Sequence, residues 1–166
     1  MTVALIIFVT SAVIFGFVVL FGAPFVPTRK TWAQAALNLA KIKSSDTVVD
    51  LGSGTGIILK LSVAAGARAI GYELNPLLVL FSKIRLIRYG NKTDVKMANF
   101  WKLDLPLDTT VVYVFSIQRD DKKLIKYLHD QAVKLKTKKL RVVSFGLPLH
   151  GEKPVAKSSG ANLYMF

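Results

Sequence analysis

The sequence predicts an α/β protein, a mostly parallel sheet with helices on both faces, preceded by one N-terminal transmembrane helix. Short apolar runs typical of buried strands alternate with segments of helical periodicity. A glycine-rich turn joins the first of these strands to the helix that follows it. The chain begins with a long uncharged run. With 166 residues, 52% of them hydrophobic, the length fits one domain plus an appendage.

The amino-terminal run is uncharged from residue 1 to residue 28 and almost wholly apolar over 3–22. A bilayer core of about 30 Å requires about 20 such residues in a helix. A secretory signal peptide would carry a basic segment before its apolar part, whereas the first basic residue here is Arg29. A buried core helix of this length is seldom apolar on every face. We therefore expect a membrane anchor over 1–24 and the α/β domain over 25–166.

The charge distribution indicates an orientation and a partner. All 23 Lys and Arg residues follow the apolar run, and the net charge is +13. The positive-inside rule therefore predicts a single-pass membrane protein with its N-terminus outside and its domain in the cytoplasm. The excess charge predicts a nucleic acid or an anionic membrane surface nearby. The chain has no cysteine and only His129 and His150, so we expect no metal site.

The elements that follow the apolar run are placed by hydrophobic periodicity and by helix end signals. A helical period at 29–42 precedes a buried-type strand at 47–51. Gly66 ends the next helix, and Asn75 with Pro76 begins the one after it, as N-cap and first helical residue. The expected helices are 29–42, 57–67, 75–90 and 120–136, and the expected strands are 47–51, 68–74, 93–99, 111–116 and 139–146, with two short strands inside 154–166.

The turn after strand 47–51 predicts the ligand. Its glycines follow the pattern G-x-G-x-G, not the G-x-G-x-x-G of dinucleotide sites. Asp50 stands two residues before the first glycine, where a carboxylate would repel a pyrophosphate but suit a cationic ligand. S-adenosylmethionine fits, because it has an amino acid end and a sulfonium and no phosphate. The residues of this turn that we expect around the ligand are Asp50, Gly52, Ser53, Gly54 and Gly56.

A second acidic residue supports this interpretation. Glu73 closes strand 68–74, 23 positions after Asp50, where a carboxylate can accept hydrogen bonds from both ribose hydroxyls. A tight turn in an α/β domain that binds nothing is the alternative. The ordered set of strand, glycine turn, helix, strand and Glu73 favours binding.

Several motifs give the chain a family resemblance. They are "PFVPT" (24–28), "DLGSGTG" (50–56), "GYELNPLLV" (71–79), "NFWKLDL" (99–105) and "RVVSFGLPLHGEKPV" (141–155). The chain resembles the class I S-adenosylmethionine-dependent methyltransferases, which have a Rossmann-like sheet. Among these it is most similar to the membrane-anchored lysine methyltransferases that modify ATP synthase and the adenine nucleotide translocase, and to their prokaryotic relatives.

The resemblance implies a role for each matched residue. The glycine turn and Asp50 would surround the methionine part of the cofactor. Glu73 would hold the ribose, with Leu74 and Asn75 beside it, and Asn99 and Phe100 would frame the adenine. The chain departs from the family pattern at Asn99 and at Thr55, where the family has Asp, and over 115–121, the region that contacts substrate.

The catalytic residues stay unassigned. Thr28 could cover the cofactor as part of a lid, or it could cap helix 29–42. Asp120 could act as a base, or its charge could stabilise a helix N-terminus. A lysine substrate must lose its proton, which costs about 4–5 kcal/mol at pH 7, and a desolvated channel beside a sulfonium would lower that cost.

The function expected from these observations is protein-lysine N-methylation of membrane proteins. An RNA methyltransferase would use basic patches such as 83–102 and 122–141, but the N/D-P-P-Y tetrad of amino-methylating nucleic-acid enzymes is absent. Nucleic acid is therefore not the expected partner, and anionic headgroups explain the charge more simply. A lipid or quinone methyltransferase at the membrane and a non-enzymatic membrane protein remain as alternatives.

Overall fold

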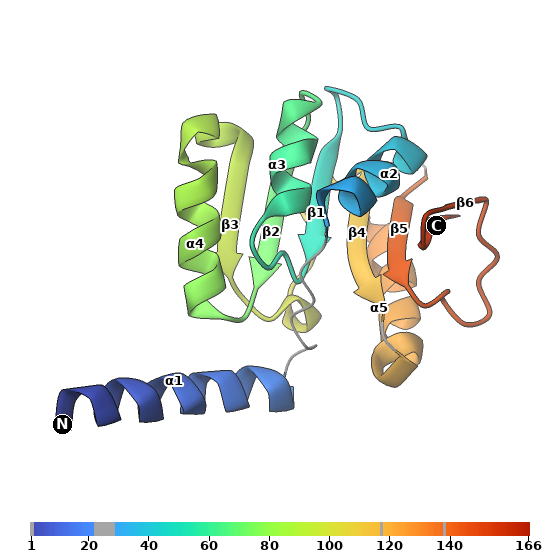
Figure 1. The fold of residues 1–166 in the computed structure, drawn as a ribbon. Coiled ribbons are helices and arrows are strands. Elements are labelled where there is room, and N and C mark those ends of the chain that lie inside the picture. Colours follow the sequence, from blue (N-terminus) through green and yellow to red (C-terminus); the bar gives the residue numbers. More distant parts are fainter. Residues whose placement is uncertain (1, 22–28, 117, 138) are drawn as a thin grey trace.

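One sheet of seven strands organises the protein (Figure 1). The computed structural model describes residues 2–21, 29–116, 118–137 and 139–166. The strand order is β3-β2-β1-β4-β5-β7-β6; the first five are parallel, and β7 runs antiparallel to both β5 and β6. The strands are β1 Thr47–Leu51, β2 Arg68–Glu73, β3 Thr93–Met97, β4 Val111–Ser116, β5 Arg141–Gly146, β6 Ala156–Ser158 and β7 Ala161–Met165.

The helices confirm the predicted order, with changes at their ends. The bounds are α1 Thr2–Phe21, α2 Lys30–Ala40, α3 Ile57–Ala64, α4 Pro76–Leu86 and α5 Asp121–Lys134, with 3₁₀ helices η1 Ile87–Lys92, η2 Phe100–Lys102 and η3 Gln118–Asp120. The helix predicted over 75–90 continues past Leu86 as the 3₁₀ helix η1, and the non-helical backbone of Gly90 interrupts η1 near the predicted end. The N-cap residue of α2 is Arg29, and no side chain caps it.

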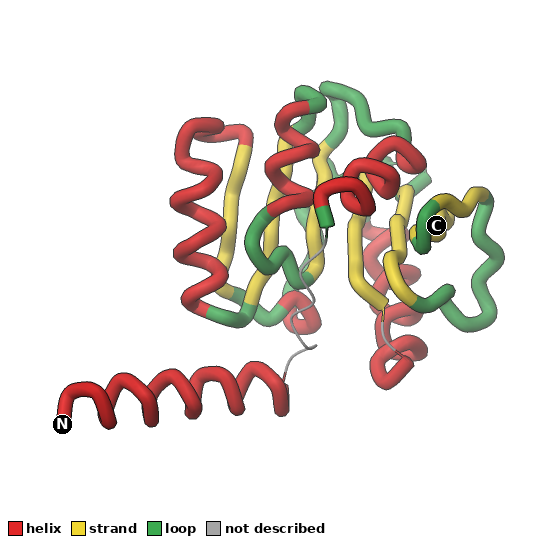
Figure 2. Tube along the Cα trace, viewed as in Figure 1, coloured by secondary structure: helices red, strands yellow, loops and turns green. Residues whose placement is uncertain are grey.

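Helices cover both faces of the sheet, as predicted (Figures 1 and 2). Helices α2, α3 and α4 lie on one face and α5 on the other. The alternation along β1 produces this division: Val48 packs among residues of α2 and α3, while Val49 and Leu51 pack in the cluster that contains Leu124 of α5. All five β1 side chains are buried, as expected for a strand in the middle of a parallel sheet that is covered on both faces.

The apolar amino-terminal run forms α1, which Figure 1 shows outside the layers of the α/β domain. Side chains at 2–12 that the structure describes are exposed. None of the helices, within the described part of the chain, combines the length and apolar character needed to cross a membrane. The structure therefore does not support the transmembrane anchor predicted over 1–24.

A buried ion pair fastens the amino-terminal ends of the strands. Asp46, immediately before β1, pairs with Arg141, the first residue of β5, and the two side chains are only 6% and 20% exposed. Asp46 also accepts hydrogen bonds from the Thr110 hydroxyl (2.8 Å) and the Lys43 backbone N–H (2.7 Å). Arg141 donates to the carbonyl of Ala40 at the end of α2 (2.7 Å). The pair therefore joins α2, β1, β4 and β5.

Removing one partner of this pair should destabilise the fold strongly. Arg141→Ala leaves the Asp46 carboxylate buried without its cation, so we expect a loss of about 3–5 kcal/mol in the free energy of unfolding. Arg68→Ala is the matched control, because its pair with Asp108 is about half-exposed and should contribute about 0–1 kcal/mol. Urea denaturation of both variants measures the difference, and equal losses would contradict the assignment.

Candidate cofactor site

The two predicted acidic residues come together at the carboxyl ends of the strands. In the parallel β1–β2 ladder Asp50 lies opposite Gly71, and Glu73 follows two residues further along β2. Since side chains alternate along a strand, Asp50 and Glu73 point to the same face of the sheet, the one covered by α2, α3 and α4. Both are buried, and the site lies at the carboxyl ends of the strands, where ligands bind in open α/β sheets.

The glycine loop, residues 52–56, lies directly over the end of β2. The backbone N–H groups of Gly52 and Ser53 both donate to the Tyr72 carbonyl at 2.9 Å. Gly52, Gly54 and Gly56 all have positive φ, from +51° to +89°, a conformation that side chains disfavour. The backbone at these three positions therefore favours glycine.

Gly71 is a further glycine that the site requires, and sequence reasoning missed it. A Cβ atom at this position would lie 2.6 Å from the Ser53 hydroxyl and 2.7 Å from a Leu59 methyl group. The loop can therefore approach β2 only because Gly71 has no side chain. A glycine inside a strand is the sequence signal for such an approach.

Glu73 fixes the loop through its carboxylate. Its Oε2 accepts from the Gly54 N–H, and its Oε1 accepts from the N–H groups of Leu74 and Asn75, each at 2.8 Å. Each carboxylate oxygen can accept two hydrogen bonds, so Oε2 retains capacity for a ribose hydroxyl while Oε1 is occupied by the turn. The structure thus brings Glu73, Gly54, Leu74 and Asn75 together, and the ribose contact stays a prediction.

Asp50 is in a different environment. Burial raises the pKa of its carboxyl well above the ordinary 3.8, and the negative charge of Glu73 raises it further. No hydrogen-bond donor to this carboxylate is present among the described residues. A cation placed here would relieve both effects. The Asp50 carboxylate therefore fits the cationic amino acid end of S-adenosylmethionine.

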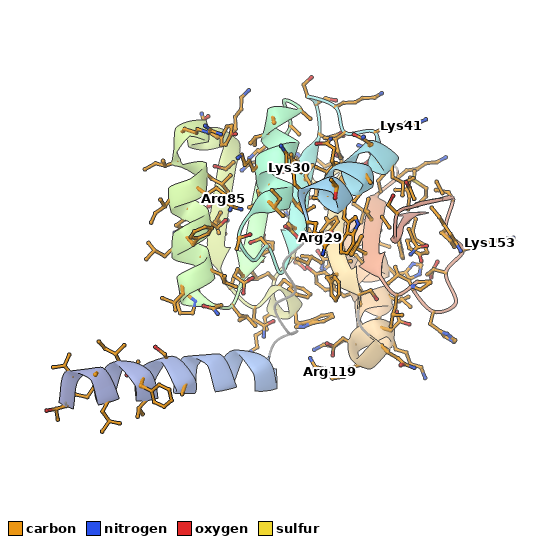
Figure 3. The ribbon with its side chains drawn as sticks, viewed as in Figure 1. Arg29, Lys30, Lys41, Arg85, Arg119 and Lys153 are labelled. Atoms are coloured by element: carbon orange, nitrogen blue, oxygen red, sulfur yellow. The ribbon has the colours of Figure 1, made fainter. Side chains whose placement is uncertain are left out.

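Helix α4 supports the loop from the side. Asn75 caps the helix, its Oδ1 accepting from the N–H of Leu77 (3.0 Å) and, at 3.4 Å, from that of Leu78. A Cβ on Gly56 would lie 2.2 Å from the Ser82 hydroxyl, so α4 packs tightly against the loop. Arg85, labelled in Figure 3, donates to the carbonyl (3.0 Å) and hydroxyl (3.3 Å) of Thr55. The sequence pattern did not reveal this contact.

The predicted adenine residues lie after β3. Asn99 caps the short helix η2 by accepting from the Trp101 N–H at 3.1 Å, and it is partly buried, as is Phe100. Phe100 packs on Trp101 with ring centroids 4.4 Å apart, and both rings contact Tyr127 at 5.9 Å. Phe100 and Trp101 therefore belong to the edge of the core.

The proposed catalytic candidates gain no support from the geometry. Asp120 forms an ion pair with its neighbour Arg119 at 3.0 Å, and Thr28 lies outside the described residues. Two other polar groups near the end of β4, the Ser116 hydroxyl and Oδ1 of Asp121, are buried without a hydrogen-bond partner among the described residues. The sequence pattern singled out neither of them as a site residue.

The fold is similar to that of solved S-adenosylmethionine-dependent methyltransferases. The crystal structure of an RNA methyltransferase from Salinibacter ruber in complex with S-adenosyl-L-homocysteine has a TM-score of 0.74, 26% sequence identity, and coverage of 85% of this chain and 92% of that one. No family model matches the chain.

Particular lysine methyltransferases are similar in sequence. The ATP synthase subunit-C lysine N-methyltransferase of Xenopus laevis is 34% identical over 115 residues, 66% of this chain and 50% of that protein. A protein-lysine N-methyltransferase of Saccharolobus islandicus (strain REY15A) is 28% identical over 79% of this chain and 81% of that protein. The adenine nucleotide translocase lysine N-methyltransferase of Mus musculus is 32% identical over 80% of this chain and 57% of that protein. The predicted resemblance is confirmed. The chain spans about half the length of the Xenopus protein.

The raised pKa of Asp50 predicts a proton-linked binding event. A cationic ligand favours the carboxylate and lowers the pKa of Asp50, so binding should release a proton at pH values just below the raised pKa of the free protein. Calorimetry in buffers of different ionisation enthalpy measures this release. Asp50→Asn should abolish it and weaken binding of S-adenosylmethionine roughly ten- to a hundredfold. Unchanged proton release in the variant would remove Asp50 from the site.

Proposed function

We propose that this protein is an S-adenosylmethionine-dependent protein-lysine N-methyltransferase. The observation that carries the proposal is the pair of buried carboxylates at the glycine loop. Burial and the charge of Glu73 raise the pKa of Asp50, while Glu73 accepts one backbone hydrogen bond from the loop and two from the turn after β2. Relatives named for lysine methylation are similar in sequence to this chain.

The residues of the chain position the cofactor and leave its chemistry to the sulfonium. When bound, S-adenosylmethionine supplies the electrophilic methyl group for an in-line displacement. Asp50 would bind the ammonium of its amino acid end, and the free capacity of Glu73 Oε2 would receive a ribose hydroxyl. The glycine loop permits close approach of the backbone. Positioning of this kind supplies much of the rate of such a displacement.

The acceptor lysine enters, in this proposal, near the carboxyl end of β4. Leu51 lies opposite Val114 in the β1–β4 ladder, so the end of β4 reaches the level of the glycine loop. There the buried Ser116 hydroxyl and Oδ1 of Asp121 are available to receive an ammonium group. Oδ2 of Asp121 already accepts from the His150 N–H at 2.9 Å, which fixes the carboxylate. Burial and the nearby sulfonium would lower the pKa of the lysine.

A membrane protein is the proposed substrate, and an anionic membrane surface the proposed location. Two relatives carry ATP synthase and the adenine nucleotide translocase in their names as the proteins whose lysines they methylate. Large apolar side chains of α1 are exposed, with Val3, Phe8 and others more than half accessible. Only six residues separate Gly22 from Arg29, a span of at most ~20 Å, so an amino-terminal segment held at a membrane would keep the site close to the headgroups.

RNA is the second candidate substrate, because the similar structure from Salinibacter ruber, of which this chain covers 92%, is named an RNA methyltransferase. The basic surface of this chain is also compatible with phosphate contacts. The two candidates differ in the acceptor, a lysine amine or an RNA base or ribose. A transfer assay therefore distinguishes them directly.

The substrate prediction is loss of methyl-lysine from integral membrane proteins when the gene is deleted. Mass spectrometry of membrane proteins and of ribosomal RNA, with and without the gene, compares the two acceptors. The intact chain should restore the modification and Glu73→Ala should not, because that substitution removes the hydrogen bond from the glycine loop and two more from the turn after β2. Methylation lost only from RNA, or only from a lipid, would replace the lysine proposal.

The location prediction is a membrane-bound protein with its N-terminus outside and its domain in the cytoplasm. The basis is the uncharged run over 1–28 followed by 23 basic residues. Carbonate washing should leave the protein with the membrane, and protease added to intact cells should leave the domain uncut. Release by carbonate, or digestion from outside, would contradict this location.

A further inference from the structure

Helix α4 has two apolar faces, and only one of them is covered. Val79, Ser82 and Leu86 pack inward against the sheet and the glycine loop. On the opposite side a second apolar stripe is open to solvent, with side chains 50–80% exposed. The residues of this outer stripe are Leu77, Leu80, Phe81 and Ile84 of α4 and Ile87, the first residue of η1. Exposed apolar side chains that gather on one face of a helix mark a candidate binding surface.

The charges beside the outer stripe indicate what covers it. Lys83 and Arg85 flank the stripe on its two sides, and Arg88 follows at its end. The segment 74–93 contains four basic residues and no Asp or Glu. An apolar face with Leu and Phe, bordered by Lys and Arg, is the composition of helices that lie in the interface of an anionic bilayer. A protein partner would need an acidic rim to match it, whereas anionic headgroups supply that charge directly.

We propose that the outer stripe of α4 is a membrane-docking surface that inserts into the headgroup region of an anionic bilayer. The inference rests on the membrane location in the proposed function and not on the reaction. It is separate from α1, since it places a second contact on the folded domain itself.

The same helix holds the cofactor site. The Arg85 guanidinium lies 4.9 Å from the centre of the Phe81 ring, at the border of the stripe, and donates to Thr55 in the glycine loop (Figure 3). The amino end of α4 begins at Asn75, beside Glu73. Docking through α4 therefore fixes the height and orientation of the site above the bilayer, and a lysine close to the headgroups is the acceptor that this orientation favours.

The absence of cysteine in the chain permits a direct test. Leu80→Cys in the full chain carries a single fluorescent label in the stripe. Val133→Cys is the matched control, because Val133 is also an exposed apolar side chain, 88% accessible, on α5 across the sheet. Both proteins are mixed with phosphatidylcholine vesicles, with or without phosphatidylglycerol, that contain nitroxide-labelled lipid as quencher.

The expected result is strong quenching of the label at position 80 on vesicles with phosphatidylglycerol, several-fold less without it, and little at position 133. Adding Ile84→Asp should reduce quenching at position 80, because it places a carboxylate in the stripe. Vesicle binding with equal quenching at both positions would overturn α4 docking while leaving the membrane location intact. No binding at all would overturn both. Excimer formation by a pyrene label at position 80 without vesicles would assign the stripe to a second copy of the chain instead.

Discussion

The carboxylate of Glu73 connects the parts of the site that would otherwise be independent. It accepts backbone hydrogen bonds from the glycine loop after β1 and from the turn after β2, so the two loops are held at one separation. Charge-assisted hydrogen bonds of this kind are stronger than neutral ones, and here they lie in a buried place. The turn also leads into α4, whose Asn75 cap depends on the same backbone geometry. Loop, turn and helix therefore form one rigid unit.

Asp50 and Glu73 show how two carboxylates on one sheet face can differ in chemistry. Glu73 is surrounded by donors from the chain, which stabilise its charge without a ligand. Asp50 is buried beside that charge, and the described residues offer it no donor, so its ionised form is destabilised. The carboxylate of Glu73 accepts hydrogen bonds from the protein itself, whereas a bound cation would stabilise the ionised form of Asp50. In the proposed function Glu73 organises the loop and Asp50 binds the cationic end of the ligand.

The sequence was informative where the pattern was local. Strands β1 and β4 have the predicted bounds because each is a short apolar run that is buried on both faces of a parallel sheet. Asp50, Glu73 and the loop glycines were found because their order along the chain reflects a strand–turn–helix unit. Helix ends were less accurate: the α-helix predicted up to residue 90 ends at Leu86 and continues as the 3₁₀ helix η1.

Contacts between distant segments could not be predicted in this way. Gly71 belongs to the site only because Ser53 and Leu59 fold over it, and Arg85 only because Thr55 lies within reach. The predicted transmembrane anchor came from composition alone, and the structure does not support it. The adenine residues Asn99 and Phe100 were placed by family pattern, and their neighbours in space are Trp101 and Tyr127.

The arrangement of polar groups along the strands has a practical consequence for protein engineering. The ion pair of Asp46 and Arg141 lies at the amino-terminal ends of the strands, and the glycine loop lies at their carboxyl ends. The length of β1, Thr47–Leu51, separates the two. Substitutions near the ion pair that stabilise the protein against heat can therefore be screened separately from substitutions at the glycine loop that alter ligand choice. Because effects at sites without shared contacts usually add, gains at the ion-pair end can be combined with changes at the loop end.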